Sequence, residues 1–470
     1  MKFRKGLKIM SLAAAAAVLC GSLVGCENGG GSTSSNGKTQ ISVAGWPSKE
    51  GKDKENMEAK KARFEEANPE FEIVPDNWSF DLKSFYPKAA GGQLPTVYGT
   101  HFTEVSQIIA AGYSADITEQ LKKDGLYDKF NPQVLDLVSK DGKVYAFPYA
   151  TYALGLAFNV DMMEAAGLME ADGTPKQPKD WYEVAEFAVK IKEATGNPGF
   201  VFPSANNNGG WIFTPVAWSF GVDFMEKGSD GKWKAIFDSP EATEALQFIK
   251  DLKWKYDVLP ANTLIDGTEY YKIFGTGGAG IQITAGDVPS KLTQYGMQPE
   301  QFGMMAMPAG PKRHVTLMGG SIQAVSNKAT DKQIEGSLKW LETSYTPEAT
   351  DEYKKNTETD IDRRLEKNEL IGIKSMSIWN TDSEAVKFSH KLIDEKTNAN
   401  PNHVKLYNDF VADLGDCKLR PEEPVCAQEL YGILDGCIQE VLTNKDADCA
   451  ALLKKACSDF QVNYLDNLDY

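Results

Sequence analysis

The chain has 470 residues, a formal net charge of −16 and 42% hydrophobic residues, so it is long enough for two or three layered domains with substantial cores. Its acidic balance argues against nucleic acid binding, which depends on neutralising phosphates with basic side chains. The same balance argues against a protein that lies flat on an anionic lipid surface.

The first 25 residues have the layout of a secretory signal peptide. Four basic residues precede an apolar stretch that is too short and too interrupted to be a comfortable transmembrane helix. Residues 23–26, Leu-Val-Gly-Cys, resemble the bacterial lipobox, in which the cysteine receives a diacylglyceryl group and becomes the N-terminus after cleavage. Lipid on Cys26 is therefore expected to hold the protein at the cell membrane, facing the extracellular side. The alternative is an ordinary signal peptide with an incidental cysteine.

A flexible tether is expected to follow this anchor. Residues 27–38 consist largely of glycine, serine and asparagine, and as a random coil they would span roughly 20 Å. Removal of the 25-residue signal peptide from 470 residues leaves 445, and the loss of its four positive charges changes the net charge from −16 to −20. The folded body is thus expected to stay near the membrane but to move freely.

From residue 38 the pattern is that of an α/β protein. Short alternating strands are predicted at 41–46, 71–74 and 96–100, and a charged helix at 54–68. Strands that alternate with helices imply crossover connections and a largely parallel sheet. Ligands of such sheets bind beyond the carboxyl ends of the strands, so binding residues are expected in the loops that follow these strands.

Residues 144–159 are unusually long and apolar for one strand, which predicts that this segment crosses from one domain into another. A second α/β region follows it. This region contains predicted helices near 181–195, 212–220 and 240–255 and predicted strands at 280–284 and 320–325. The remaining tail has an almost wholly helical pattern, and the sequence has no repeat of solenoid period.

Five of the seven cysteines are close to the C-terminus, and because five is odd, at least one thiol of a monomer stays unpaired within it. Cys449 and Cys457 are eight residues apart in a helical pattern, about 12 Å along the axis, and a disulfide needs Cα atoms within about 7 Å. Cys437 is expected to face one of them across a helix hairpin, and Cys417 to face Cys426. No close Cys-x-x-Cys pair suggests zinc.

Six short motifs occur in order along the chain, at residues 141–148, 154–159, 162–167, 275–286, 308–311 and 317–327. Together they resemble the family 1 extracellular solute-binding proteins of ABC importers, the group that includes maltose-binding and other sugar-binding proteins. The resemblance implies an α/β, two-lobed, periplasmic-binding-protein-like (type II) fold with three crossovers between the lobes and a helical C-terminal tail. The implied divisions are a signal peptide (1–25), a lipidated tether (26–38), lobe I (39–150 and 282–322) and lobe II (151–281 and 323–470).

The implied function is capture of an extracellular mono- or oligosaccharide in the cleft between the lobes and its delivery to ABC permease subunits in the membrane. The protein is expected to be a monomer with no cofactor and no metal. The lobes are expected to close by a hinge motion, because a solute favours the closed state through contacts with both lobes. Two alternatives stay open: a binding protein for a non-sugar solute such as a polyol phosphate or peptide, and a surface-anchored hydrolase.

Two motifs that could indicate an enzyme have the wrong structural context. Residues 275–280 match the G-x-G-x-x-G pattern of dinucleotide sites, but a predicted helix precedes them and a strand follows, which reverses the required order. Residues 217–221 are one residue from the nucleophile elbow G-x-S-x-G, but Ser219 lies in a helical pattern rather than after a strand. The chain is therefore not expected to be an enzyme.

Aromatic residues are the first candidates for sugar binding, because a pyranose has an apolar face that stacks on an indole or phenol ring. Trp46 ends the first predicted strand and Trp78 follows the second, so both are candidates to face the cleft. Ordinary packing at the sheet edge is the alternative. Trp340 lies at core spacing in a predicted helix and is expected to be structural.

The resemblance to the maltose-binding pattern adds candidates in the first lobe and on the first crossing strand. Thr100 and His101 occupy the loop that carries polar sugar ligands. Tyr152 lies on the crossing strand where that pattern has an acidic ligand. The change from acid to phenol argues against maltose itself as the solute.

Three further candidates come from the same resemblance. Trp211 falls where the family has a stacking aromatic, and it follows the polar run 206–210, which is poor core material. Asp287 lies in the loop after the second return, and Trp379 lies near a further stacking position in the tail. Trp211 is expected to be the main sugar platform.

Overall fold

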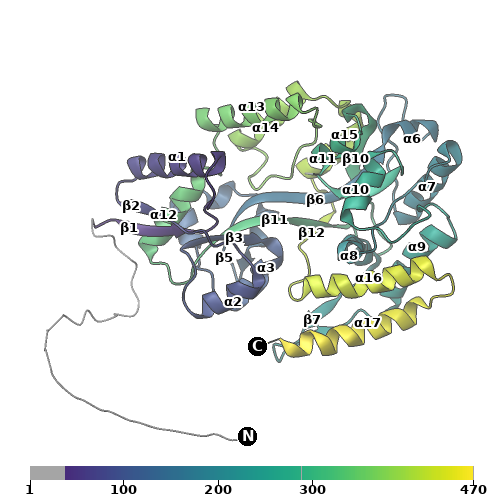
Figure 1. Ribbon diagram of the computed structural model, residues 1–470, viewed down its shortest axis with the longest axis horizontal. Helices are drawn as coiled ribbons and strands as arrows, with labels where there is room; N and C mark the ends of the chain where they lie inside the picture. Colours follow the sequence, from purple (N-terminus) through teal and green to yellow (C-terminus); the bar gives the residue numbers. More distant parts are fainter. Residues whose placement is uncertain (1–36, 287, 469–470) are drawn as a thin grey trace, which may run out of the picture.

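The computed structural model describes residues 37–286 and 288–468, so Cys26, the predicted signal peptide and Asp287 lie outside the described residues. Within that part of the chain, no helix combines the length and the apolar composition needed to span a membrane. The molecule is elongated, and its two longest strands run along the long axis between two lobes (Figure 1).

One eight-stranded sheet connects the lobes, in the order β10-β6-β11-β3-β1-β2, with β12 beside β11 and β9 beside β6. Its strands are β1 (Thr39–Val43), β2 (Phe71–Pro75), β3 (Val97–His101), β6 (Phe147–Asn159), β9 (Ile281–Ala285), β10 (Phe302–Ala306), β11 (Val315–Val325) and β12 (Lys418–Arg420). β1 pairs in parallel with β2 and β3, as the alternation of strands and helices predicts. β6 and β11 run antiparallel to their neighbours in the sheet except β12, so the sheet as a whole is mixed.

Strand β6 passes from one lobe to the other. Its first half pairs with β11, and its second half pairs with β9 and β10. Residues 153–159 are buried, which explains why this segment reads as a continuous apolar run rather than as an alternating strand. The predicted crossing segment is therefore confirmed.

Lobe I is built around β1, β2 and β3. Its helices are α1 (Lys52–Ala67), α2 (Leu82–Ala90), α3 (Phe102–Ala110), α4 (Thr118–Lys123) and α5 (Pro132–Asp136), and the short hairpin of β4 (Ser139–Lys140) and β5 (Lys143–Val144) follows them. Helix α12 (Asp331–Glu342) packs on β1, and its Trp340 ring stacks on Trp46 at a centroid distance of 6.3 Å. We therefore propose that lobe I also contains α12, in addition to residues 39–150 and 282–322.

Lobe II has an aromatic core. Its elements are α6 (Val160–Ala165), α7 (Trp181–Thr195), α8 (Asn208–Phe220), β7 (Met225–Lys227), β8 (Trp233–Ala235), α9 (Pro240–Trp254) and α10 (Gly267–Gly275), whereas α11 (Pro289–Leu292) falls within residues 282–322. Asp180 caps α7 by accepting a hydrogen bond from the Glu183 amide, and Gly196 ends it with a left-handed φ of 75°. The predicted helix at 181–195 is confirmed to the residue because both end signals are present in the sequence.

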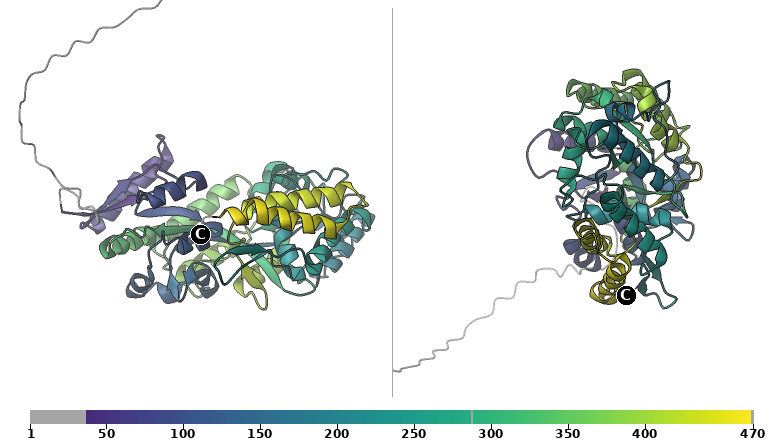
Figure 2. Two further views of the ribbon diagram at one scale, coloured as in Figure 1. Left: turned by 90° about the horizontal axis from the view of Figure 1, so that it is seen from below. Right: turned by 90° about the vertical axis from the view of Figure 1, so that its right-hand side faces the viewer.

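The helical tail is divided among several parts of the molecule. It contains α13 (Asp351–Glu366), α14 (Glu384–Lys396), α15 (Pro401–Ala412), α16 (Ala427–Thr443) and α17 (Cys449–Asn463). α13 and α14 pair with each other around a small core of their own, and α15 packs on β10. The α16–α17 hairpin packs on α8 and α9, on the outer side of lobe II (Figures 1 and 2).

The five tail cysteines of the described region are free thiols. Cys437 on α16 lies opposite the first turn of α17, with its Sγ 4.0 Å from the Leu452 carbonyl oxygen. Burial, followed by the nearby Cys449, raises the pKa of Cys437 to about 12. The predicted hairpin is thus confirmed, and so is the helix that separates Cys449 from Cys457. Cys417 belongs to the core that begins in lobe I, whereas Cys426 packs against the core of lobe II.

Candidate functional site

One carboxylate joins the two lobes. Glu422 lies on the loop between β12 and α16, and its Oε2 accepts a hydrogen bond of 2.9 Å from the Thr103 hydroxyl on α3. Its Oε1 accepts a hydrogen bond of 3.0 Å from Nε1 of Trp211 on α8. Thr103 belongs to lobe I and Trp211 to lobe II. The loop between β12 and α16, which we call the tail loop, therefore lies at the junction between the lobes. We call these surroundings of Glu422 the lobe junction.

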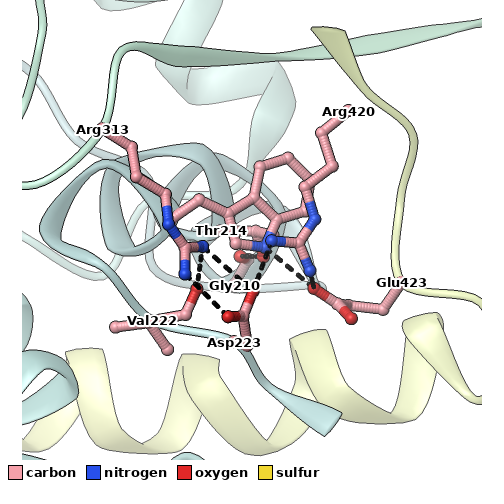
Figure 3. A network of polar contacts seen from close by, with 8 residues as sticks. Gly210, Thr214, Val222, Asp223, Arg313, Arg420 and Glu423 are labelled. Carbon is pink, nitrogen blue, oxygen red and sulfur yellow. Dashed lines mark hydrogen bonds and ion pairs between the residues drawn. The ribbon is translucent and has the colours of Figure 1, made fainter. Parts of the chain in front are cut away.

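A network of ion pairs between side chains holds the tail loop on lobe II (Figure 3). Arg313 donates two hydrogen bonds to Asp223, of 3.0 and 2.7 Å, and Arg420 donates one to Asp223 of 2.7 Å and one to Glu423 of 3.2 Å. The bonds from Arg313, ahead of those from Arg420, lower the pKa of Asp223 to about 2. Trp218 donates its Nε1–H to Glu423 at 2.8 Å and carries the Arg420 guanidinium over its ring. Both guanidinium groups are therefore already paired.

Helix α16 holds the helix that carries Trp211. Oδ2 of Asp435 on α16 accepts a hydrogen bond from the Asn207 amide, and Oδ1 accepts one from the Gly210 amide, each of 2.7 Å. This carboxylate therefore satisfies free N–H groups at the start of α8. A Cβ atom on Gly210 would lie 2.4 Å from the Tyr431 carbonyl oxygen, so the close approach of the two helices requires glycine there.

The lobe junction is strongly acidic. Glu104 on α3 is 8% exposed, and burial, followed by the charges of Glu422 and Glu429, raises its pKa to about 7. Burial also raises the pKa of Glu422, against the lowering effect of its hydrogen bonds to Thr103 and Trp211. Oε2 of Glu104 has no hydrogen-bond partner among the described residues. Burying a carboxylate next to like charges and without a hydrogen-bond donor costs free energy, unless another group supplies the donor.

Four of the eight predicted ligand-binding residues lie at or beside the lobe junction. Trp211 is half-buried and bonded to Glu422. His101 is exposed at the end of β3 and lies close enough to Glu422 to act on it electrostatically. Tyr152 lies on β6, close enough to Tyr431 of α16 to influence it electrostatically. Thr100 precedes His101 and is buried, with no hydrogen bond to its hydroxyl among the described residues. Their contact with a solute stays a prediction.

The other predicted residues lie elsewhere. Trp46 is 3% exposed, and its Nε1 donates to Glu58 at 3.1 Å. Trp379 is 4% exposed and stacks on Phe130 at a centroid distance of 4.2 Å. Trp78 is partly exposed in lobe I, where its Nε1 donates to Ser84 at 3.2 Å. Both buried rings therefore have structural contacts in this conformation.

Three residues of the lobe junction are absent from the sequence-based set: Glu104, Glu422 and Tyr431. Glu104 has a sequence signal, since it lies between Phe102 and Val105 on the apolar face of α3, where a carboxylate is unexpected. Glu422 has none, because the residues it bonds are 319 and 211 positions away in the chain.

The structure gives no support to the enzyme motifs. Ser219 is buried inside α8, where it donates to the Val216 carbonyl and accepts from Trp181 Nε1. The glycine run at 275–280 lies after α10 and before β9, so the predicted reversal of the dinucleotide motif is confirmed. No group of three or more histidine, cysteine or acidic residues in the described ranges could hold a metal ion.

Comparison with known proteins agrees with this architecture. The sequence profile of the bacterial extracellular solute-binding protein family matches residues 48–351. A putative binding protein of Brucella abortus is 28% identical over 290 residues, which span 60% of this chain and 65% of the relative. The sn-glycerol-3-phosphate-binding periplasmic protein UgpB of Salmonella typhimurium is 25% identical over 330 residues, 66% of this chain and 72% of the relative. The structure of maltose-bound T. maritima MalE3 superposes with a TM-score of 0.58 at 23% identity, covering 90% of this chain and 99% of that one.

Proposed function

This chain belongs to the bacterial extracellular solute-binding protein family, and we propose that its solute is a carbohydrate bound at the lobe junction. The solute would be a mono- or oligosaccharide, and the protein would deliver it to the permease subunits of an ABC importer. The proposal includes no catalytic step, no cofactor and no metal. It also includes a monomeric state, since one chain supplies residues from both lobes.

The observation that carries the proposal is the bridge from Thr103 through Glu422 to Trp211. A sugar needs an aromatic face for its apolar side and hydrogen-bond acceptors for its hydroxyl groups. Trp211 is a half-buried indole next to a carboxylate, and both belong to a place where the lobes meet. A solute there would contact both lobes, which is the condition under which binding favours closure.

The proposal also includes the place of the protein in the cell. Cys26 would carry lipid and hold the protein on the outer face of the membrane, with residues 27–38 as a tether. A Cys26→Ser variant is then expected to lose lipid labelling and to be released as soluble, folded protein. Unchanged membrane attachment of that variant would contradict the anchor.

A thermal-shift screen over a carbohydrate panel tests the proposal. A solute that binds only the folded state raises its stability by RT ln(1 + [L]/Kd), so the cognate sugar is expected to raise the melting temperature with increasing concentration. Chromatography of the recovered solute is expected to return it unchanged. Conversion to a product would favour the surface hydrolase instead.

A non-sugar solute is the second candidate, and the match to UgpB favours including it. The same screen therefore contains sn-glycerol 3-phosphate and short peptides. A shift with one of these and with no carbohydrate would replace the proposed solute class while leaving the solute-binding function in place.

A further inference from the structure

The lobe junction combines acidic groups from two separate parts of the chain. Glu104 comes from α3 of lobe I, whereas Glu422 and Glu429 come from the loop and first turn that begin α16. Thr103, the neighbour of Glu104, donates directly to Glu422. Glu422 and Glu429 both act electrostatically on Glu104. Any solute that enters here meets negative charge from both sides.

One buried polar atom at this place has unused hydrogen-bonding capacity. Oε2 of Glu104 has no donor among the described residues, and the residue is only 8% exposed. The Tyr431 hydroxyl, by contrast, lies within hydrogen-bonding reach of Glu422. Buried polar groups are normally paired, so Oε2 of Glu104 indicates a place that a ligand donor can fill.

The positively charged side chains of the neighbouring network are already paired with carboxylates. Figure 3 shows that Arg313 and Arg420 both point to Asp223, and that Arg420 also reaches Glu423. His101 also acts electrostatically on Glu422. An anionic solute would therefore meet three carboxylates while the two nearby guanidinium groups remain bonded to their own partners.

We infer that the solute of this protein carries a positively charged amino group, as an amino sugar does, and that Glu104 and Glu422 recognise it. This inference rests on the proposed function and makes its solute class more specific. A neutral hydroxyl could fill the vacant acceptor at Glu104, but it would leave the repulsion among the carboxylates in place. An ammonium group donates to the same oxygen and neutralises the charge, and such charge-assisted bonds are about twice as strong as neutral ones.

Calorimetry with matched solutes tests the inference. The probes are hexose mono- and oligosaccharides, each as the neutral sugar, the 2-amino sugar and the sugar phosphate, together with sn-glycerol 3-phosphate. The amino form of the best-binding sugar is expected to bind at least about tenfold more tightly than its neutral counterpart, and the phosphate form is expected to bind most weakly. Higher salt is expected to reduce the preference for the amino form, because salt screens charges.

Three variants locate the preference. Glu104→Gln and Glu422→Gln keep the shape of the side chain and remove its charge, so each is expected to reduce the amino preference to less than about threefold. Glu366→Gln, on an exposed residue of α13, removes one charge away from the junction and is expected to leave the preference unchanged.

The outcomes separate the inference from the proposed function. Equal or tighter binding of the neutral or phosphorylated form would overturn the inference and leave solute binding intact. An amino preference that persists in both junction variants would also overturn it, because other residues would then recognise the amine. Failure of every probe to bind would overturn the proposed carbohydrate and, with it, the amino sugar.

Discussion

Trp211 and Trp340 are both helix tryptophans, but their surroundings give them different roles. Trp211 is half-buried at the lobe junction and bonded to Glu422. Trp340 is 2% exposed, lies against Trp46 and meets Phe64 edge-on at a centroid distance of 5.5 Å. At the scale of single residues, one should therefore act mainly on binding and the other on stability.

The Trp211→Ala variant is expected to bind its solute roughly thirtyfold to thousandfold more weakly, which corresponds to about 2–4 kcal/mol for a buried aromatic hot spot. The melting temperature of the solute-free protein is expected to fall less than that of Trp340→Ala, because Trp211 is only partly buried at the edge of the lobe II core. Trp340→Ala is the matched control, with an expected loss of roughly 3–5 kcal/mol of stability and unchanged affinity. Calorimetry and melting curves on both variants measure these effects. Wild-type affinity in Trp211→Ala would contradict the placement of the sugar platform.

Glu104 predicts a dependence of stability on pH. Its pKa is about 7 in the folded protein, and the usual value is 4.5, so the folded state holds this proton more strongly than the unfolded state does. The stabilisation is complete below pH 4.5 and is lost as pH rises through about 7. Glu104→Gln cannot ionise, so its stability relative to wild type is expected to rise between pH 5 and 8 by up to roughly 3 kcal/mol. Urea unfolding at a series of pH values checks this, and a constant difference between the two proteins would refute it.

At the scale of elements, the contact between α8 and α16 determines where Trp211 lies. The polar run at 206–210 looks like poor core material in the sequence, but the structure uses it as a helix contact, with Asp435 capping α8 and glycine allowing the close approach. Glycine is compatible with either role, and only the position of α16, which comes more than 200 residues later, decides between them. By contrast, the bounds of α7 follow from local signals, because Asp180 and Gly196 are next to the helix that they terminate.

Two glycine substitutions test this contact. Gly210→Ala is expected to destabilise the protein by about 1–3 kcal/mol, since the added methyl group would collide with the backbone of α16 at Tyr431. Gly436→Ala is the control, because its Cβ would meet no atom within 4 Å on the exposed side of α16. The control is expected to stabilise the protein by about 0.5–1 kcal/mol through helix propensity. Equal effects of the two substitutions on the free energy of unfolding would contradict the role of Gly210.

At the scale of the whole molecule, the sequence predicts the lobes better than it predicts the residues between them. The apolar run at 144–159 is long enough to identify β6 as a crossing strand without any knowledge of its neighbours. Trp46 and Trp211 have similar sequence surroundings, because both lie next to polar or glycine-rich segments. Burial of Trp46 depends on Trp340, which is distant in the chain, and Glu422 reaches the lobe junction only because β12 pairs with β11. Contacts of this kind depend on the tertiary fold, which local patterns do not contain.

The central claim is that the solute is held between the two lobes, so residues of both lobes must contribute to its affinity. Calorimetric Kd values for wild type, His101→Ala in lobe I, Trp211→Ala in lobe II and the double variant measure this most directly. We expect both single variants to bind more weakly, His101→Ala by about two- to tenfold, which corresponds to the loss of one hydrogen bond, and Trp211→Ala by far more. Wild-type affinity in either single variant would mean that the solute binds to one lobe alone, and it would contradict the account.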